Sequence, residues 1–164
     1  MTTASLRRCL IALFLVGFMG CGGEPKTPKQ AAESNPPDQK EKEAIAAIEE
    51  LGGTVESLGP GAGINVSFTN ETPTDAALVH LKQLTNLEWL SLGNTNVTDA
   101  GLVHVEGLTN LTNVYLYDTE VTDAGLVHLK GLTNLKMLDL GGSNVTDEGV
   151  NELQTALPNC TIVR

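Results

Sequence analysis

Histidine and aspartate are the side chains of this sequence whose types and spacing could do chemistry. Three histidines, His80, His104 and His128, stand 24 residues apart, a spacing that suggests one per helix of a repeated unit. Adjacent helices pack about 8–10 Å apart, whereas each ligand of a zinc ion lies about 2.0–2.1 Å from the metal. Single histidines on successive helices therefore cannot converge on one ion. We expect them to lie on a helix surface and to bind no metal.

The aspartates form a second column, in which Asp75, Asp99, Asp123 and Asp147 each follow a threonine. At a helix start, a carboxylate accepts backbone N–H bonds and opposes the helix dipole. A calcium site would need several acidic oxygens around one point, and the sequence contains no such cluster. We therefore expect this column to cap helices.

Nucleophilic and acid–base catalysis find no support in the sequence. The histidines belong to the expected helices and the hydroxyl residues of the strands to the other face, so no Ser-His-Asp triad can close. Glu88 and Asp139 are strand carboxylates of different units and different lateral positions, which argues against a paired acid and base. A phosphate loop of the GxxxxGK type is also absent from the sequence. We expect no enzymatic activity and no cofactor.

The common spacing of these residues comes from a 24-residue repeat. Three segments align without a gap, LVHLKQLTNLEWLSLGNTNVTDAG from Leu78, LVHVEGLTNLTNVYLYDTEVTDAG from Leu102 and LVHLKGLTNLKMLDLGGSNVTDEG from Leu126. Leu90 and Leu92 alternate with residues of another kind, which is typical of a strand with one buried face. Leucines three apart precede each strand and predict a short helix. Each unit is therefore a strand and a short helix joined by turns, and neighbouring units stack on one core.

The pattern LxxLxLxxTxV, with the trailing TDAGL, resembles the leucine-rich repeat family in the short-period form of many bacterial secreted proteins. The resemblance covers residues 63–164. It implies an α/β leucine-rich repeat solenoid, a short horseshoe with a parallel β-sheet on the concave face and short helices on the convex face. It also implies a non-catalytic binding module whose ligand is a protein or a peptide.

Both ends of such a stack need a cap, because a terminal repeat would otherwise expose leucines to water. We predict an N-terminal cap over residues 41–62, within a repeat domain of residues 41–164. In this cap, Glu41 to Leu51 forms an amphipathic helix, and Thr54-Val55 starts a short edge strand. The apolar face of the helix contains Ala44, Ile45, Ile48 and Leu51.

Two further predictions concern the first strand and the C-terminal end of the stack. Residues 64–68 fit the repeat as a divergent first strand. Residues 150–164 form the C-terminal cap, in which Val150, Leu153 and Leu157 belong to the last helix. An incomplete strand from Cys160 to Val163 follows, which makes Cys160 a packed residue rather than a reactive one.

Aromatic residues gather on the predicted open face of the sheet. If Leu90 and Leu92 point inward, the outward positions form the candidate ligand-binding set, which is Trp89, Ser91, Asn113, Tyr115, Tyr117, Met137 and Asp139. Amphipathic rings beside an acid are the composition of binding hot spots. Small residues, including Ser67, Gly93 and Gly141, predict a shallow groove beside the rings. In the alternative interpretation, the rings favour strands anyway and only shield the sheet.

The first residues predict export and a lipid anchor. Arg7 and Arg8 precede an apolar run that is about half as long as the roughly 20 residues of a spanning helix. Residues 1–20 are therefore predicted as a signal peptide of the lipoprotein type, because Phe18-Met19-Gly20-Cys21 resembles a bacterial lipobox. Cys21 would carry the lipid and would be the sole membrane attachment. An ordinary secretory signal with an incidental cysteine is the alternative.

Residues 21–40 are predicted to be a disordered tether, because prolines are frequent there and no aliphatic residue exceeds alanine. Such a tether would place the domain in the cell envelope, on the periplasmic side or at the cell surface.

Charge and composition exclude other partners. The chain has 20 acidic and 10 basic residues, a formal net charge of −10 and only 4% aromatic residues. Nucleic acid and anionic membrane surfaces both require a clustered basic surface, which this chain lacks. We predict a monomer, anchored by lipid, that binds a protein or peptide through the concave sheet. Carbohydrate binding at the same rings, and a structural envelope role without a discrete ligand, are the alternatives.

Overall fold

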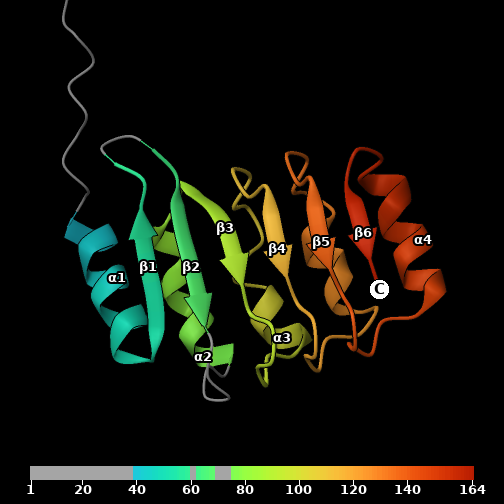
Figure 1. The fold of residues 1–164 in the computed structure, drawn as a ribbon, viewed down its shortest axis with the longest axis horizontal. Coiled ribbons are helices and arrows are strands. Elements are labelled where there is room, and N and C mark those ends of the chain that lie inside the picture. Colours follow the sequence, from blue (N-terminus) through green and yellow to red (C-terminus); the bar gives the residue numbers. More distant parts are fainter. Residues whose placement is uncertain (1–38, 60–61, 69–74) are drawn as a thin grey trace, which may run out of the picture. The chain divides into compact units, whose positions relative to one another are not determined.

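The computed structural model describes residues 39–59, 62–68 and 75–164. The predicted signal peptide, Cys21 and most of the predicted tether lie outside these residues. The described residues form one sheet with helices on one face (Figure 1). This is the α/β leucine-rich repeat solenoid that the sequence predicts.

The sheet contains six strands in chain order. They are β1 Gly53–Ser57, β2 Ile64–Phe68, β3 Leu87–Ser91, β4 Asn113–Tyr115, β5 Met137–Asp139 and β6 Thr161–Val163. β1 and β2 pair antiparallel, and every later pair is parallel. Leu90 pairs with Val114, and Val114 with Leu138. Equivalent residues of successive units are thus neighbours, as the 24-residue repeat requires.

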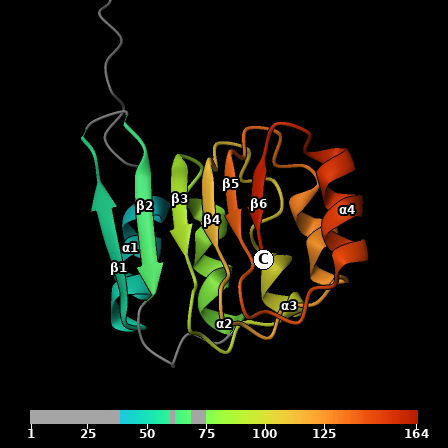
Figure 2. The same cartoon turned by 45° about the vertical axis from the view of Figure 1, so that its right-hand side comes forward.

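The helical segments lie on one side of the sheet, with α1 at the β1 end and α4 at the β6 end (Figures 1 and 2). They are α1 Gln39–Glu50, α2 Asp75–Leu78, the 3₁₀ helix η1 Val79–Gln83, α3 Asp99–Leu102, the 3₁₀ helix η2 Gly125–Leu129 and α4 Asp147–Ala156. Ala44 and Ile48 of α1 are buried as predicted. Leu51 lies beyond the end of this helix and is 44% exposed, so its predicted place on the buried face is wrong.

The core runs between the sheet and the helices. Leu90, Val114 and Leu138 have no exposed surface, and neither do Leu92 and Leu116. At the C-terminal end, Cys160 is 4% exposed and its Sγ donates to the Thr161 carbonyl, 3.7 Å away. Burial raises the pKa of this thiol above its ordinary value, which keeps the sulfur protonated near neutral pH. The prediction that Cys160 is a packed residue is confirmed.

The aspartate column connects neighbouring units instead of capping its own helices. Asp75 accepts hydrogen bonds from the backbone N–H of Thr98 at 2.9 Å and from its hydroxyl at 2.7 Å. Asp99 binds Thr122 in the same way, at 2.8 and 2.6 Å. The cap of α3 is Thr98, whose hydroxyl oxygen accepts from the Ala100 N–H at 3.2 Å. The predicted capping role of the aspartates is therefore wrong, because Asp75, Asp99 and Asp123 each reach the threonine of the next unit. Asp147, in the last unit, accepts instead from the guanidinium of Arg164.

This aspartate ladder requires a glycine in the following unit. A Cβ atom on Gly101 would lie 2.4 Å from the Oδ1 atom of Asp75, and one on Gly125 would lie 2.3 Å from the Oδ1 of Asp99. The equivalent residue of the first unit is Ala77. This unit follows the antiparallel N-terminal cap, and no aspartate of the described cap residues occupies a ladder position, so a methyl group is tolerated there.

Candidate binding surface on the sheet

The face of the sheet opposite the helices carries the predicted ligand-binding residues. No described helix lies over this face (Figures 1 and 2). In the strand register, Trp89 neighbours Asn113 and Asn113 neighbours Met137, while Ser91 neighbours Tyr115 and Tyr115 neighbours Asp139. The face therefore has two rows of side chains that run across the strands. The predicted binding residues in these rows are half-buried, except Ser91, which is buried.

Trp89 and Tyr115 form an aromatic pair across the two rows. Their ring centroids lie 5.3 Å apart and the ring planes are inclined by 49°, a favourable geometry for two aromatic rings. Ser91, the lateral neighbour of Tyr115, is only 9% exposed. It therefore offers little surface to a ligand, and the rings are the accessible groups at this point.

The ring of Tyr117 fills the space above Gly93, where the sequence predicted a shallow groove. A Cβ atom on Gly93 would lie 2.2 Å from the Cε1 and Cζ atoms of the Tyr117 ring. The ring therefore packs directly on the backbone of Gly93. The groove predicted at Gly93 is absent for this reason, although Tyr117 itself keeps a half-exposed ring surface.

The hollow of this face lies instead between β1 and β3. It has a volume of about 250 Å³ and is lined by Thr54, Glu56, Asn65, Ser67 and Trp89. The antiparallel register places Glu56 beside Asn65 and Thr54 beside Ser67, which extends the two rows onto β1. Sequence reasoning missed Thr54, Glu56 and Asn65. The available signal was the alternation of outward residues along the predicted edge strand.

A β-bulge determines where Trp89 enters this hollow. Ile64 pairs with Leu87, but the next residue, Asn65, pairs with Trp89, so Glu88 is an extra residue in β3. Such a bulge re-aims the side chains that follow it. Trp89 consequently stands in the same row as Asn65 and forms one wall of the hollow.

The two rows carry negative charge and no positive charge. Across β1 to β6 they contain the carboxylates of Glu56 and Asp139, and no lysine, arginine or histidine. Asp139 accepts a hydrogen bond from the backbone N–H of Gly141 at 3.0 Å, which orients its side chain. Glu56 is exposed and makes no side-chain hydrogen bond or ion pair with another described residue. This electrostatic character favours a cationic ligand over an anionic one.

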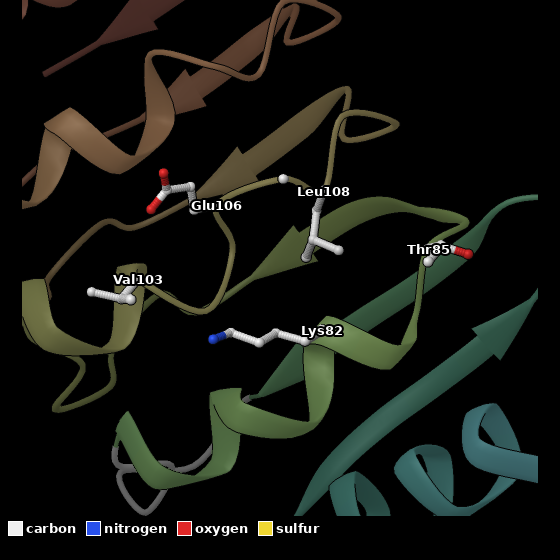
Figure 3. A pocket seen from close by; sticks show the side chains of 6 residues that line it. Lys82, Thr85, Val103, Glu106 and Leu108 are labelled. Atoms are coloured by element: carbon white, nitrogen blue, oxygen red, sulfur yellow. The ribbon is translucent and has the colours of Figure 1, made fainter.

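A larger hollow, of about 410 Å³, lies between two successive units on the helix side (Figure 3). Lys82 and Thr85 come from one unit, and Val103, Glu106 and Leu108 from the next. Its lining combines one charge of each sign with aliphatic groups and has no aromatic wall. It is the weaker candidate, because these groups also make the ordinary contacts between neighbouring units.

His104 and His128 belong to those contacts. His128 Nδ1 lies 3.2 Å from an oxygen of Glu106, whereas the equivalent charged residue one unit earlier is Lys82. His104 Nδ1 is buried and has no hydrogen-bond partner in the described structure. Burial lowers the pKa of His104 below its ordinary value, and the charge of Lys82 lowers it further. In the described part of the chain, no His, Cys, Asp or Glu side chains are grouped so that they could hold a metal ion.

Comparison with known proteins identifies structural neighbours only. No family model and no curated protein matches the chain. Among solved structures, an internalin C2 of Listeria monocytogenes is 30% identical with a TM-score of 0.42, over 52% of this chain and 36% of that protein. An internalin, InlF, of the same species is 20% identical with a TM-score of 0.39, over 52% and 30%.

A third neighbour is a leucine-rich repeat protein of Leptospira interrogans, 25% identical with a TM-score of 0.42, over 52% of this chain and 21% of that protein. The chain thus spans little more than a third, or less, of the length of each of these three proteins.

Proposed function

We propose that this chain is a non-catalytic binding module that engages a protein or peptide through the open face of its sheet. The observation that supports this most is the paired rings of Trp89 and Tyr115 beside a hollow on an otherwise uncovered surface. Aromatic anchors next to a pocket dominate the binding energy of many protein interfaces, because they bury a large area with few rotatable bonds.

A purely structural role for the rings explains less of the geometry. Leu90 and Val114, which lie in the same strands on the inner face, are fully buried by the helices. Trp89 and Tyr115 add nothing to that core, and they remain half-buried even after packing on each other. Two large rings that stay partly exposed to solvent on an uncovered face are explained better by a binding role than by a packing role.

A quantitative capture experiment tests this proposal. The full chain and the double variant Trp89→Ala, Tyr115→Ala are immobilised separately and exposed to an extract of the source cell's envelope proteins. We expect proteins retained by the parent chain and lost from the variant, as measured by mass spectrometry. Val103→Ala on the helix side serves as the control and should retain them. Equal capture by the double variant would refute the proposal.

Carbohydrate binding is the second candidate, and the hollow itself favours it. Hydroxyl groups of Thr54 and Ser67, the amide of Asn65 and the indole ring of Trp89 line one cavity. Sugars need such hydrogen-bonding groups together with an aromatic platform. A glycan array probed with the full chain separates the two functions, because saturable glycan binding that the double variant loses would favour the carbohydrate.

Envelope attachment through Cys21 is part of the same proposal. None of the described helices combines the length and the apolar character that crossing a bilayer requires. A diacylated cysteine followed by a proline-rich tether supplies attachment without such a helix. We expect Cys21→Ser to move the protein from the membrane fraction to the soluble fraction. Unchanged sedimentation with membranes would contradict the lipid anchor. The tethered domain is proposed to act as a monomer.

A further inference from the structure

We infer that the hollow between β1 and β3 receives the side chain of an arginine or a lysine of the bound partner. This inference rests on the proposed binding function and makes it more specific. The groups that would contact the cation are the carboxylate of Glu56, the indole of Trp89 and the oxygen atoms of Asn65, Thr54 and Ser67.

The charge of the surface is the first argument. Glu56 lines the hollow and makes no described ion pair, and the two rows of the face contain no basic residue that could neutralise it. On the helix side, by contrast, Lys130 pairs with Glu152 at 2.6 Å and His128 contacts Glu106 at 3.2 Å. The helix-side carboxylates are therefore partly matched within the fold, whereas Glu56 is left for a group from outside.

The indole of Trp89 is the second argument. Among aromatic side chains, tryptophan attracts cations most strongly over its ring face. Tyr115 packs against Trp89 with a centroid separation of 5.3 Å and so restricts the orientation of the indole. An indole whose orientation is restricted in this way loses little conformational entropy when a guanidinium or ammonium group binds.

The remaining polar groups of the hollow are suited to accept hydrogen bonds. The Thr54 hydroxyl donates to the Ser67 carbonyl at 3.3 Å, which leaves the lone pairs of the Thr54 oxygen available as acceptors. Asn65 adds a carboxamide oxygen beside Glu56. Lysine and arginine have only donors in their charged groups, so this arrangement complements them.

The size of the hollow favours a single side chain over a whole small molecule as its occupant. Its volume of about 250 Å³ lies below the roughly 300–1,000 Å³ of pockets that enclose drug-sized ligands. It is nevertheless several times larger than the roughly 30 Å³ that one water molecule occupies. A single long side chain, presented by a partner that covers the aromatic pair, fits this range.

Trp89 makes the inference directly measurable, because it is the only tryptophan of the chain. Its fluorescence can be followed in the full chain during titration with acetyl-Gly-Arg-Gly-amide, and with the same peptide containing citrulline, a neutral analogue of nearly equal shape. We expect saturable quenching by the arginine peptide, and binding roughly 1.5-fold to fivefold weaker for citrulline, the range expected for one exposed ion pair.

Substitution of the carboxylate completes the test. Glu56→Gln should reduce the preference for arginine over citrulline to what the indole alone provides, while Glu148→Gln, which removes one exposed carboxylate at the start of α4, should preserve it. Equal melting temperatures of the two variants would exclude misfolding as the cause. Equal affinity for both peptides in the parent chain, absence of saturation, or a preference unchanged by Glu56→Gln would each overturn the cation site.

The failure of this inference is distinguishable from failure of the proposed function. If the peptides are not discriminated but the double variant Trp89→Ala, Tyr115→Ala still loses the captured proteins, only the cation site is rejected. If quenching by neutral oligosaccharides saturates and is insensitive to Glu56→Gln, the hollow is a sugar subsite and the cation site is again overturned.

Discussion

The helix side and the open sheet face of this molecule use the same repeat in opposite ways. On the helix side, the column Asp75, Asp99 and Asp123 is uniform, and each carboxylate bonds to the threonine of the next unit. On the sheet face, one of the two rows contains Trp89, Asn113 and Met137, which share neither size nor chemistry. Positions with a fixed partner in the next unit keep their residue type, and positions that face solvent vary.

This difference indicates which residues the fold requires and which remain available for binding. The aspartate ladder specifies three residue types at once, because the carboxylate needs a threonine donor and a glycine without a Cβ atom. A sheet-face residue has to satisfy only the strand backbone and its lateral neighbours. Stability should therefore depend strongly on the first class and weakly on the second.

The largest expected effect comes from the shared core. Leu116 is fully buried in the middle unit, so Leu116→Ala removes apolar contacts and leaves a cavity. We expect the free energy of unfolding to fall by about 2–5 kcal/mol, as measured by chemical denaturation. A change within experimental error would mean that the inward register of this strand is wrong.

The next effect tests the ladder itself. Gly125→Ala places a Cβ atom 2.3 Å from Asp99 Oδ1, and we expect a loss of about 1–3 kcal/mol from overpacking and a displaced hydrogen bond. Gly131→Ala is the matched control, because no atom lies within 4 Å of the added methyl group. If both variants unfolded at the same denaturant concentration, the requirement of the aspartate ladder for glycine at position 125 would be contradicted.

A smaller effect is expected on the sheet face. Trp89→Ala with Tyr115→Ala removes a half-exposed ring pair, and an exposed pair of this kind contributes only about 0.5–1.5 kcal/mol beyond the area that it buries. The melting temperature should therefore change less than in Leu116→Ala, while protein capture is lost. A loss of stability as large as that of the core variant would assign the rings to packing.

The same contrast explains what could be predicted from the sequence. Alternation within a strand and the 24-residue spacing act over short distances along the chain, and they correctly predict the sheet, the helix side and the buried leucines. The partner of Asp75 lies 23 residues away in the next unit, where hydrogen-bond geometry decides between Thr98 and the helix start. A repeat shows that an aspartate is required but not which donor it meets.

The candidate site was only partly predictable for a related reason. The aromatic pair follows from the alternation along β3 and β4. The hollow depends on the extra residue Glu88, which shifts Trp89 into the row of Asn65, and on the antiparallel pairing of β1. Both features occur where the chain departs from its repeat, so the 24-residue spacing does not predict them.

One helix-side column also varies, and it refines the comparison. Lys82, Glu106 and Lys130 are equivalent residues of successive units. Glu106 contacts His128 and Lys130 pairs with Glu152, so two of the three side chains have a partner one unit later. Lys82 instead faces His104, whose pKa it lowers. Variation by itself therefore does not identify a binding surface. What distinguishes the sheet face is variation without a compensating partner inside the fold.

Lys82→Glu tests this last point with the smallest expected effect. It would give His104 the carboxylate neighbour that His128 already has, and should raise the pKa of His104, which burial and Lys82 now lower. Because the folded pKa lies below the ordinary value of 6.5, the unfolded chain binds more protons, and stability falls as the pH drops from about 6.5 through the folded pKa.

The variant should therefore lose less stability on acidification than the parent chain. The titration of His104 can be followed by nuclear magnetic resonance, with Lys136→Glu as a control of equal charge change outside the contacts described for His104. An unchanged or further lowered pKa of His104 in Lys82→Glu would show that residue 82 and His104 do not interact electrostatically across the two units. The variation of this column would then need a partner outside the chain, and the helix side would have to be considered a binding surface as well.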